Sequence, residues 1–352
     1  MSVFLGPHKA GSGTRPAAVR LRSLIQDARA ALASKGMGEA DTAALLGPLE
    51  QLLGDPELSA GHHESFAIFR NARSMHWFRL PWDEPDSATV DSRFRLVPLI
   101  EAAPAARAFL LLLLSRKRVR LLACGPHDCE SVDLPGVPAS FEEFNALNLS
   151  DYKLIGRSPG GNTFGLSPER DKVDRHFHDY CVALGRALAP IARQRAVPLV
   201  IAGTADEVTT WRGANPPDNL WAGEVEASPD AGLSDRDLAA LARPRVAAWR
   251  SPEETYARSL HRRLAGSPRV LREMNAIVAA AAEGRLEHFF FAPGSRVDGD
   301  YFRISSRIPL AGEIISRSSD LVNAVAVDML RHSGHVWPAV PEDCVAAAIA
   351  RY

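Results

Sequence analysis

Apolar residues between positions 17 and 54 recur every three or four positions, which is the spacing of an amphipathic helix. Gly36 and Gly38 interrupt this pattern, so the stretch predicts two successive helices. Further along, Phe66–Phe69 and His76–Leu80 are short apolar runs joined by a polar turn. Such a pair predicts a β-hairpin, and together these elements predict a small α+β region at the start of the chain.

The middle of the chain predicts a layered α/β arrangement. Short apolar runs separated by turns predict three strands, at Phe109–Leu114, Val119–Ala123 and Glu130–Leu134. A long helix follows, with Ser167 as its capping residue and an apolar face that runs through Phe177 and Leu184. Val197–Ala202 then predicts a fully buried strand. A strand, a helix and a second strand in this order are typical of an α/β fold.

A polar, proline-rich stretch at 205–270 has room for two helices, and the chain after it alternates between helical and strand-like spacing of apolar residues. The predicted helices are Ser234–Ala242, Pro252–Leu264, Val270–Glu283 and Asp320–His332. The predicted strands are Leu286–Phe291, His335–Val340 and Val345–Arg351. A chain of 352 residues is too long for one ordinary core. We therefore predict three domains, at 1–100 (α+β), 101–235 (α/β) and 236–352 (α/β).

Composition and charge narrow the class of protein. The formal net charge is −1, whereas a dedicated nucleic-acid binder usually carries a basic excess, so contact with RNA would have to come from local patches. The most apolar run, Phe109–Leu114, is far shorter than the ~20 residues of a membrane helix. Met1–Pro16 lacks the apolar core of a signal peptide. Four scattered cysteines favour reduced thiols, and we expect a cytoplasmic protein.

Two basic clusters could bind phosphate. The first occupies a predicted turn and the strand that follows it, and consists of Arg116, Lys117, Arg118 and Arg120. The second lies near the end of the polar, proline-rich stretch at 205–270 and includes Arg258, Arg262 and Arg263. Because Arg suits bidentate phosphate contacts, both clusters are candidate RNA-binding sites. The alternative is a solvated surface on which these residues pair with nearby acids such as Glu254.

No pattern in the sequence predicts catalysis, a metal or a cofactor. A nucleophile elbow, a phosphate-binding P-loop and a dinucleotide fingerprint are all missing from the sequence. Cys124, His127 and Cys129 lack the fourth ligand of a structural zinc site. His176 and His178 would point to different sides of a helix. A hydrolase that uses Asp171, Asp174 or His176 is the one enzymatic alternative, and we lean against an enzyme.

Several segments, in their order along the chain, resemble the bacterial relatives of archaeo-eukaryotic class 1 release factors and Pelota, the baeRF families. They are Glu64–Leu80 (ESFAIFRNARSMHWFRL), Arg93–Ile100 (RFRLVPLI), Pro198–Gly203 (PLVIAG), Ala276–Phe291 with its helix–Gly284-Arg285–strand, Gly334–Trp337 and Val345–Tyr352 (VAAAIARY). The resemblance extends over most of the chain from Gly61 onward. It implies an N-terminal domain, a middle α/β domain and a C-terminal domain with an L7Ae-like fold.

The resemblance also assigns a role to one loop. Release factors carry a Gly-Gly-Gln loop just before the long central helix, and this chain has Gly160, Gly161 and Asn162 at that place. The glycine pair permits the close backbone approach that probing a cavity of a partner requires. Asn162 is one methylene shorter than Gln, and no Asn-Ile-Lys-Ser decoding loop occurs, so we expect neither peptidyl hydrolysis nor stop-codon reading. The alternative is an ordinary surface turn.

Two hypotheses for function follow. In the first, the protein is translation-associated and binds the ribosome or rRNA in rescue or dormancy, with a translation GTPase as a further candidate partner and no role for DNA or a membrane. In the second, it is a protein-interaction or small-ligand module that keeps the fold without contact with the ribosome. An exposed aromatic patch around Trp77, Phe78 and Trp82 would suit the second hypothesis.

Overall fold

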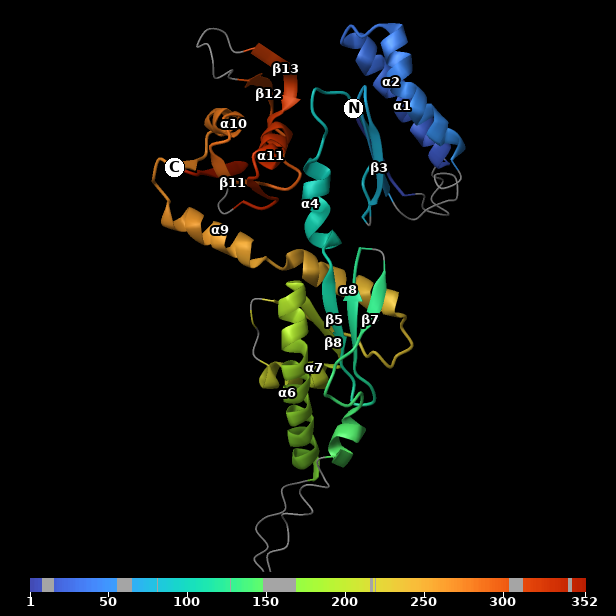
Figure 1. Cartoon of the computed structure of the whole chain (residues 1–352), viewed down its shortest axis with the longest axis vertical. Helices are drawn as coiled ribbons and strands as arrows, with labels where there is room; N and C mark the ends of the chain where they lie inside the picture. Colours follow the sequence, from blue (N-terminus) through green and yellow to red (C-terminus); the bar gives the residue numbers. More distant parts are fainter. Residues whose placement is uncertain are drawn as a thin grey trace, which may run out of the picture. The chain divides into compact units, whose positions relative to one another are not determined.

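The computed structural model shows a mixed α and β protein, which confirms the predicted fold class (Figure 1). It describes residues 1–7, 16–55, 65–80, 82–126, 128–147, 169–215, 218, 220–303, 313–340 and 344–352. The chain divides into two compact units. The first unit combines Met1–Ala103 with Glu253–Tyr352, and the second unit is Pro104–Pro252. The domain boundaries drawn from the sequence stay predictions.

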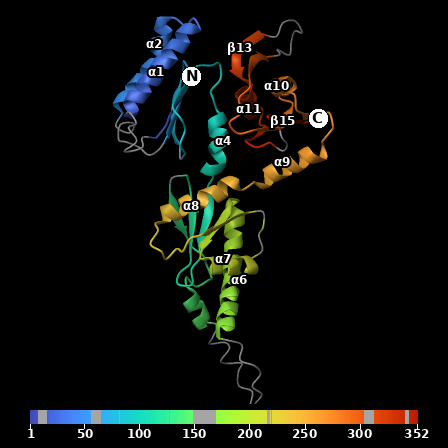
Figure 2. The same ribbon diagram turned by 180° about the vertical axis from the view of Figure 1, so that it is seen from behind.

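The N-terminal part of the first unit is a four-stranded antiparallel sheet with two helices beside each other on one face (Figures 1 and 2). Its strands, in the order β3-β2-β1-β4, are β1 (Ser2–Leu5), β2 (Ser65–Arg70), β3 (Met75–Leu80) and β4 (Ser87–Thr89). The helices are α1 (Ala17–Ser34) and α2 (Glu39–Gln51), followed by the short η1 (Leu52–Gly54). The two helices and the hairpin match the prediction from the sequence. β1 was not predicted, although it is an inner strand.

The predicted aromatic patch is wrong. Trp77 packs against Phe66 on the helix-covered face, with ring centroids 5.8 Å apart. Phe78 points to the opposite face, because successive residues of a strand alternate, and its side chain is 51% exposed. Trp82 is partly buried against the apolar cluster of that second face. Only Phe78 of the three aromatic residues is therefore largely open to solvent.

The C-terminal part of the first unit is a second four-stranded sheet between helices. Its strands, in the order β10-β15-β11-β14, are β10 (Val270–Leu271), β11 (Leu286–Phe291), β14 (His335–Trp337) and β15 (Ala346–Ala350). α10 (Met274–Ala282) and α11 (Leu321–Arg331) cover one face, and α9 (Pro252–Arg263) packs on the other. A separate pair is formed by β12 (Asp298–Arg303) and β13 (Glu313–Asp320).

One helix begins later than the sequence predicts. Val270 and Leu271 were predicted to open a helix, yet they pair with Ile349 and Ala348 of β15 as an edge strand. The helix starts at Met274. A two-residue strand leaves no periodic signal, so its apolar residues merge with those of the following helix in a pattern reading.

A buried amide joins the two parts of the first unit. Asn323, on α11, is 7% exposed, and its Oδ1 accepts the backbone N–H groups of Leu96 and Val97 at 2.7 and 3.2 Å. Its Nδ2 donates to the carbonyl of Phe94 at 2.9 Å. Val97 opens α4 (Val97–Ala106), so the amide satisfies donors at the start of that helix.

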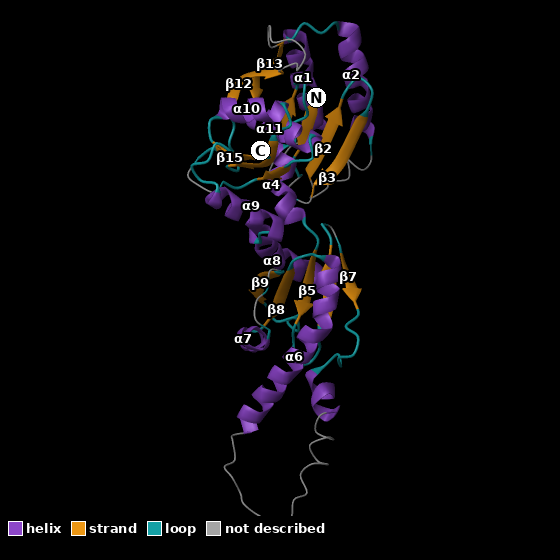
Figure 3. Ribbon diagram, turned by 60° about the vertical axis from the view of Figure 1, so that its left-hand side comes forward, coloured by secondary structure: helices purple, strands orange, loops and turns teal. Residues whose placement is uncertain are grey.

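The second unit is a five-stranded sheet between helices (Figure 3). Its strands, in the order β7-β6-β5-β8-β9, are β5 (Phe109–Leu113), β6 (Arg120–Cys124), β7 (Cys129–Val132), β8 (Leu199–Gly203) and β9 (Trp221–Glu226). α6 (Glu169–Arg195) and α7 (Ala205–Ala214) cover one face, and α8 (Asp235–Ala248) covers the other. β5, β8 and β9 are parallel neighbours, which confirms the predicted strand–helix–strand arrangement. α7 and β9 were not predicted.

A histidine is buried under α9 in the C-terminal sheet. His288 is 5% exposed, and its Nδ1 accepts the indole N–H of Trp337 at 3.3 Å. Burial lowers the pKa of His288 below its usual value, because desolvation disfavours the imidazolium, and the neighbouring His335 acts in the same direction while Glu287 opposes it.

We expect Asn323→Leu to destabilise the protein by about 3 kcal/mol, because the change leaves two buried N–H groups and a carbonyl without partners. Chemical denaturation monitored by circular dichroism measures this loss. Asn275→Leu is the matched control, since Asn275 is exposed on α10 and its replacement should cost less than about 0.5 kcal/mol. Equal effects of the two changes would contradict the structural role of the Asn323 amide.

We expect His288→Gln to weaken the pH dependence of stability on the acid side. The folded-state pKa of His288 lies below the unfolded value, so the native state binds fewer protons and loses stability as the pH falls below about 6.5. Gln keeps an acceptor for Trp337 but does not titrate. Unfolding free energies at several pH values between 7.5 and 5 should therefore fall less steeply in the variant. Trp337→Phe, which keeps the imidazole, should retain the steeper fall.

Candidate functional site

A polar network occupies the carboxyl ends of β5 and β8, the edge at which α/β proteins commonly bind ligands. Glu207, on α7, is 8% exposed. One carboxylate oxygen accepts the N–H and the hydroxyl of Thr204 at 2.9 and 2.8 Å, and the other accepts the N–H of Arg116 at 3.1 Å. The side chain therefore ties the start of α7 to the turn that follows β5.

A second side chain holds the same turn. The Ser115 hydroxyl, in a residue that is 3% exposed, donates to a carboxylate oxygen of Asp230 at 2.6 Å. The Ser115 hydroxyl oxygen in turn accepts the N–H of Lys117 at 3.1 Å. Residues 115–117 are thus held from two elements, so the turn is a rigid support for the basic side chains that it carries.

Two members of the first basic cluster are neutralised within the second unit. Arg116 pairs with Asp174 at 3.0 Å, and its guanidinium lies 4.7 Å from the centre of the Phe177 ring. Arg120, the first residue of β6, pairs with Asp235 at 2.8 Å. These contacts are the acidic pairing that the sequence left open as an alternative.

The other two members remain available to a partner. Lys117 and Arg118 are exposed, and neither forms an ion pair with any residue that the structure describes. Arg118 lies before β6 and Arg120 is the first residue of that strand, so the two side chains do not lie together on one strand. The cluster therefore offers two adjacent free cations.

The cation pair lies near the beginning of α6. Asp174, the partner of Arg116, is in the second turn of this helix, and residues 148–168 join the helix at that end. Gly160, Gly161 and Asn162 belong to that segment and lie outside the described residues. Their role as a probing loop stays a prediction.

The second basic cluster is divided in the same way. Arg258 pairs with Glu254 one turn earlier on α9 at 3.0 Å and donates to the carbonyl of Val340 at 3.3 Å. Arg262 and Arg263 are exposed in the last turn of α9, without an ion pair among the residues described.

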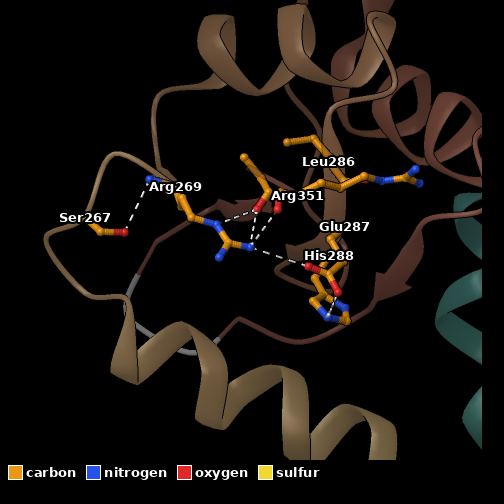
Figure 4. A network of polar contacts seen from close by, with 7 residues as sticks. Ser267, Arg269, Leu286, Glu287, His288 and Arg351 are labelled. Carbon is orange, nitrogen blue, oxygen red and sulfur yellow. Dashed lines mark hydrogen bonds and ion pairs between the residues drawn. The ribbon is translucent and has the colours of Figure 1, made fainter.

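Two further arginines close the C-terminal sheet (Figure 4). Arg269 donates from Nε and Nη2 to the carbonyl of Ala350 at 3.0 and 2.8 Å, and Glu287 lies 3.7 Å away. Arg351 donates from Nε to the carbonyl of Leu286 at 2.9 Å. The arginine near the end of the chain, part of the segment that resembles the release-factor relatives, therefore has a structural contact that its sequence position did not reveal.

The expectation of reduced thiols is wrong for one pair. Cys124 and Cys129 form a disulfide, with Cα atoms 4.0 Å apart. They are opposite one another on β6 and β7, and the turn that includes the Gly125–Asp128 hydrogen bond brings them together. Directly opposite positions next to a hydrogen-bonded pair are close enough for a bridge. His127 lies outside the described residues.

The histidines and the thiol on α6 are separated from one another by their contacts. The described residues contain no group of three His, Cys, Asp or Glu side chains able to hold a metal. His176 contacts Asn145 at 2.8 Å, whereas His178 lies beside Asp179 at 3.7 Å. Burial raises the pKa of the Cys181 thiol to about 12, so it stays protonated and unreactive. No helix in the described part of the chain is long and apolar enough to cross a membrane.

Comparisons with known proteins give a family and a set of similar structures. No curated protein matches the sequence. Similar solved structures include an archaeal translation termination factor, aRF1, at 14% identity over 100% of this chain and 92% of that one, with a TM-score of 0.23. Pelota of Archaeoglobus fulgidus is 11% identical over 82% and 80%, with a TM-score of 0.35. Dom34 of S. cerevisiae, a translation termination-like factor, is 8% identical over 82% and 81%, with a TM-score of 0.30.

The family assignment comes from the sequence itself. Residues 108–285 match the family model described as bacterial archaeo-eukaryotic release factor family 3. The match includes nearly all of the second unit, with its sheet, the rigid turn and the free cation pair. It extends over just over half of the 352 residues, and the chain therefore belongs to bacterial archaeo-eukaryotic release factor family 3.

Proposed function

We propose that this protein is a release-factor-like translation factor that binds the ribosome and acts in rescue or dormancy without reading a stop codon. Family membership supports a role in translation. The observation that carries the proposal is the pair Lys117 and Arg118, two exposed cations on a rigid turn beside the helix end to which Gly160, Gly161 and Asn162 are joined.

The cation pair suits contact with rRNA phosphates. Cations on a rigid support lose less conformational freedom on binding than cations on a loose loop. Since Glu207 and Ser115 fix the backbone of the turn, the charges are already placed. With a net charge of −1, attraction to RNA would be local, and a contact through two cations would release only about two counterions. We propose that Arg262 and Arg263 make a second, separate contact with RNA.

We propose that the protein acts by occupying a site and performs no chemistry there. Asn162 is shorter than the Gln of release factors, and the thiol of Cys181, the cysteine on α6, is buried and protonated. The proposal keeps three domains, at 1–100, 101–235 and 236–352, the last with an L7Ae-like fold. It places the protein in the cytoplasm, with a translation GTPase as a second partner.

One set of observations favours the alternative, an interaction module without ribosome contact. Arg116, Arg120 and Arg258 are all paired with acids of the same unit, so the basic surface is smaller than the sequence indicates. The binding experiment below separates the two functions.

We expect Lys117→Gln/Arg118→Gln to weaken co-sedimentation with 70S ribosomes about 5- to 30-fold, because loss of two exposed charge contacts costs roughly 1–2 kcal/mol. Binding of the unchanged protein should also weaken as salt rises from low to moderate concentration. The experiment uses the full chain on sucrose gradients, with bound fractions measured over a range of ribosome concentrations.

Arg186→Gln/Arg193→Gln is the matched control for that experiment. It removes the same charge from exposed positions on α6, more than three helical turns beyond Asp174, and should bind as the unchanged protein does. Equal weakening by both double variants would mean that only overall charge matters. Failure of the unchanged protein to sediment with ribosomes at any salt concentration would refute ribosome binding and leave the interaction module.

We expect Gly160→Val/Gly161→Val to reduce ribosome binding at least tenfold without lowering the thermal unfolding temperature. β-branched side chains block the close backbone approach that the proposed probing loop makes. Unchanged binding of this variant would show that the loop is an ordinary surface turn. A lowered unfolding temperature would instead show a structural role for the two glycines.

A further inference from the structure

A small cavity in the first unit has mainly basic walls. Its volume is about 170 Å³, and it lies between the start of α11, the end of α1 and the segment around residues 89–95. Its ionisable lining residues are Lys35, Arg93, Arg95, Arg296, Asp91 and Asp320. Four cations thus face two carboxylates. Ordinary ligand pockets have volumes of roughly 300–1,000 Å³, so this cavity suits a small ion.

Both carboxylates are already engaged with local donors. Asp320 caps α11, with one oxygen accepting the N–H of Val322 at 3.1 Å and that of Asn323 at 3.5 Å. Asp91 accepts the N–H of Ser92 at 2.6 Å and its hydroxyl at 3.2 Å. Part of each negative charge is therefore offset by donors of its own segment.

Two of the cations also have carboxylate partners. Arg93 pairs with Asp328 at 3.4 Å, where the two side chains are only 8% and 6% exposed. Arg296 pairs with Asp298 at 2.8 Å, but its side chain is 66% exposed, so it can turn toward an ion in the cavity. The first pair supports the cavity wall, and the second can exchange its partner.

The other two cations lack an acid at ion-pair distance among the described residues. Lys35 is exposed at the end of α1. Arg95 is half-buried, donates to the Ser87 hydroxyl at 3.3 Å and lies 5.9 Å from the centre of the Phe4 ring. Arg95 also acts electrostatically on Glu84, without forming an ion pair with it. A half-buried guanidinium without a counter-ion is costly, and an anion in the cavity would remove that cost.

We propose that this cavity is a phosphate-binding site in which Lys35, Arg95 and Arg296 hold one phosphate dianion. Arg suits the tetrahedral oxyanion because it donates through two nitrogens at once. The ion would link Lys35 at the end of α1 and Arg95 before α4 to Arg296 of the C-terminal part, and so stabilise the first unit. The site is separate from the cation pair on the second unit, and it does not depend on ribosome binding.

A neighbouring cavity allows two forms of the ligand, free phosphate or the phosphate group of a mononucleotide. That second cavity, of about 470 Å³, shares Asp91 and Arg93 with the first and is also lined by Phe94, Leu96 and Leu330. Its apolar wall is large enough for a nucleobase. A mononucleotide could extend from one cavity into the other, whereas free phosphate would use only the smaller one.

The test is isothermal titration of the full chain with sodium phosphate, against sodium chloride at matched ionic strength. We expect heat of binding with phosphate and none with chloride. In thermal unfolding, phosphate but not chloride should raise the unfolding temperature, since a ligand that binds only the native state stabilises it. Lys35→Gln/Arg296→Gln changes two exposed side chains and should weaken phosphate binding at least tenfold. Arg186→Gln/Arg193→Gln, on the other unit, should leave it unchanged.

We expect a third variant, Asp320→Asn, to bind phosphate more tightly. Asp320→Asn keeps a good N-cap residue for α11 but removes a negative charge from the cavity wall, so phosphate affinity should rise severalfold. A merely structural role for Asp320 would give no gain. Adenosine 5′-monophosphate that binds more tightly than phosphate would identify a nucleotide site, and equal affinity would identify a site for phosphate alone. Absence of phosphate-specific binding, or unchanged binding by Lys35→Gln/Arg296→Gln, would overturn the proposal.

Discussion

The buried amide of Asn323 is the contact on which the first unit depends. It supplies an acceptor to the two N–H groups at the start of α4 and a donor to the carbonyl just before them, from a helix more than two hundred residues away in the sequence. Val97 then packs with α10 and α11 in the C-terminal core. A polar group buried in this way is stable only when every partner is in place, so it fixes one arrangement of the two parts of the unit. The basic cavity exists because this arrangement brings Arg95 and Arg296 to one place.

Some arginines of this chain stabilise the fold and others are exposed to a partner, and the net charge does not distinguish the two groups. Arg116, Arg120 and Arg258 are held by acids, and Arg269 and Arg351 by backbone carbonyls. Charges used in this way support the fold and attract a partner only weakly, because an acid or a carbonyl offsets them. Lys117, Arg118, Arg262 and Arg263 are the exposed remainder of the two predicted clusters. Binding capacity therefore depends on where unpaired cations lie, and a net charge of −1 is compatible with a local phosphate contact.

Sequence patterns predicted the elements that have long or regular apolar patterns, and they missed short strands that are recognisable only by their pairing. The long helix α6 and the strands β5, β8 and β11 have strong apolar patterns and were found. β1 and β10 are short strands that become recognisable only through their partners, β2 and β15. In the same way, nothing local distinguishes Arg116 from Lys117, because Asp174 lies far along the chain. The basic cavity was not predicted at all, since its walls come from four segments that are distant in the sequence.

The segments by which this chain resembles its relatives are mostly those that hold the fold. Gly284 has a φ of +69°, and a Cβ there would lie 3.1 Å from the ring of His332, so glycine suits this turn for two independent reasons. Arg351 holds the backbone of Leu286, two residues after that turn. A residue in such a place stabilises the fold, and its presence does not show which partner the protein binds. The cations that we propose to bind RNA or phosphate stand in ordinary local sequence, and all of them except the half-buried Arg95 are exposed. Family membership therefore fixes the scaffold, while the functions that we propose depend on a few cations that can reach a ligand.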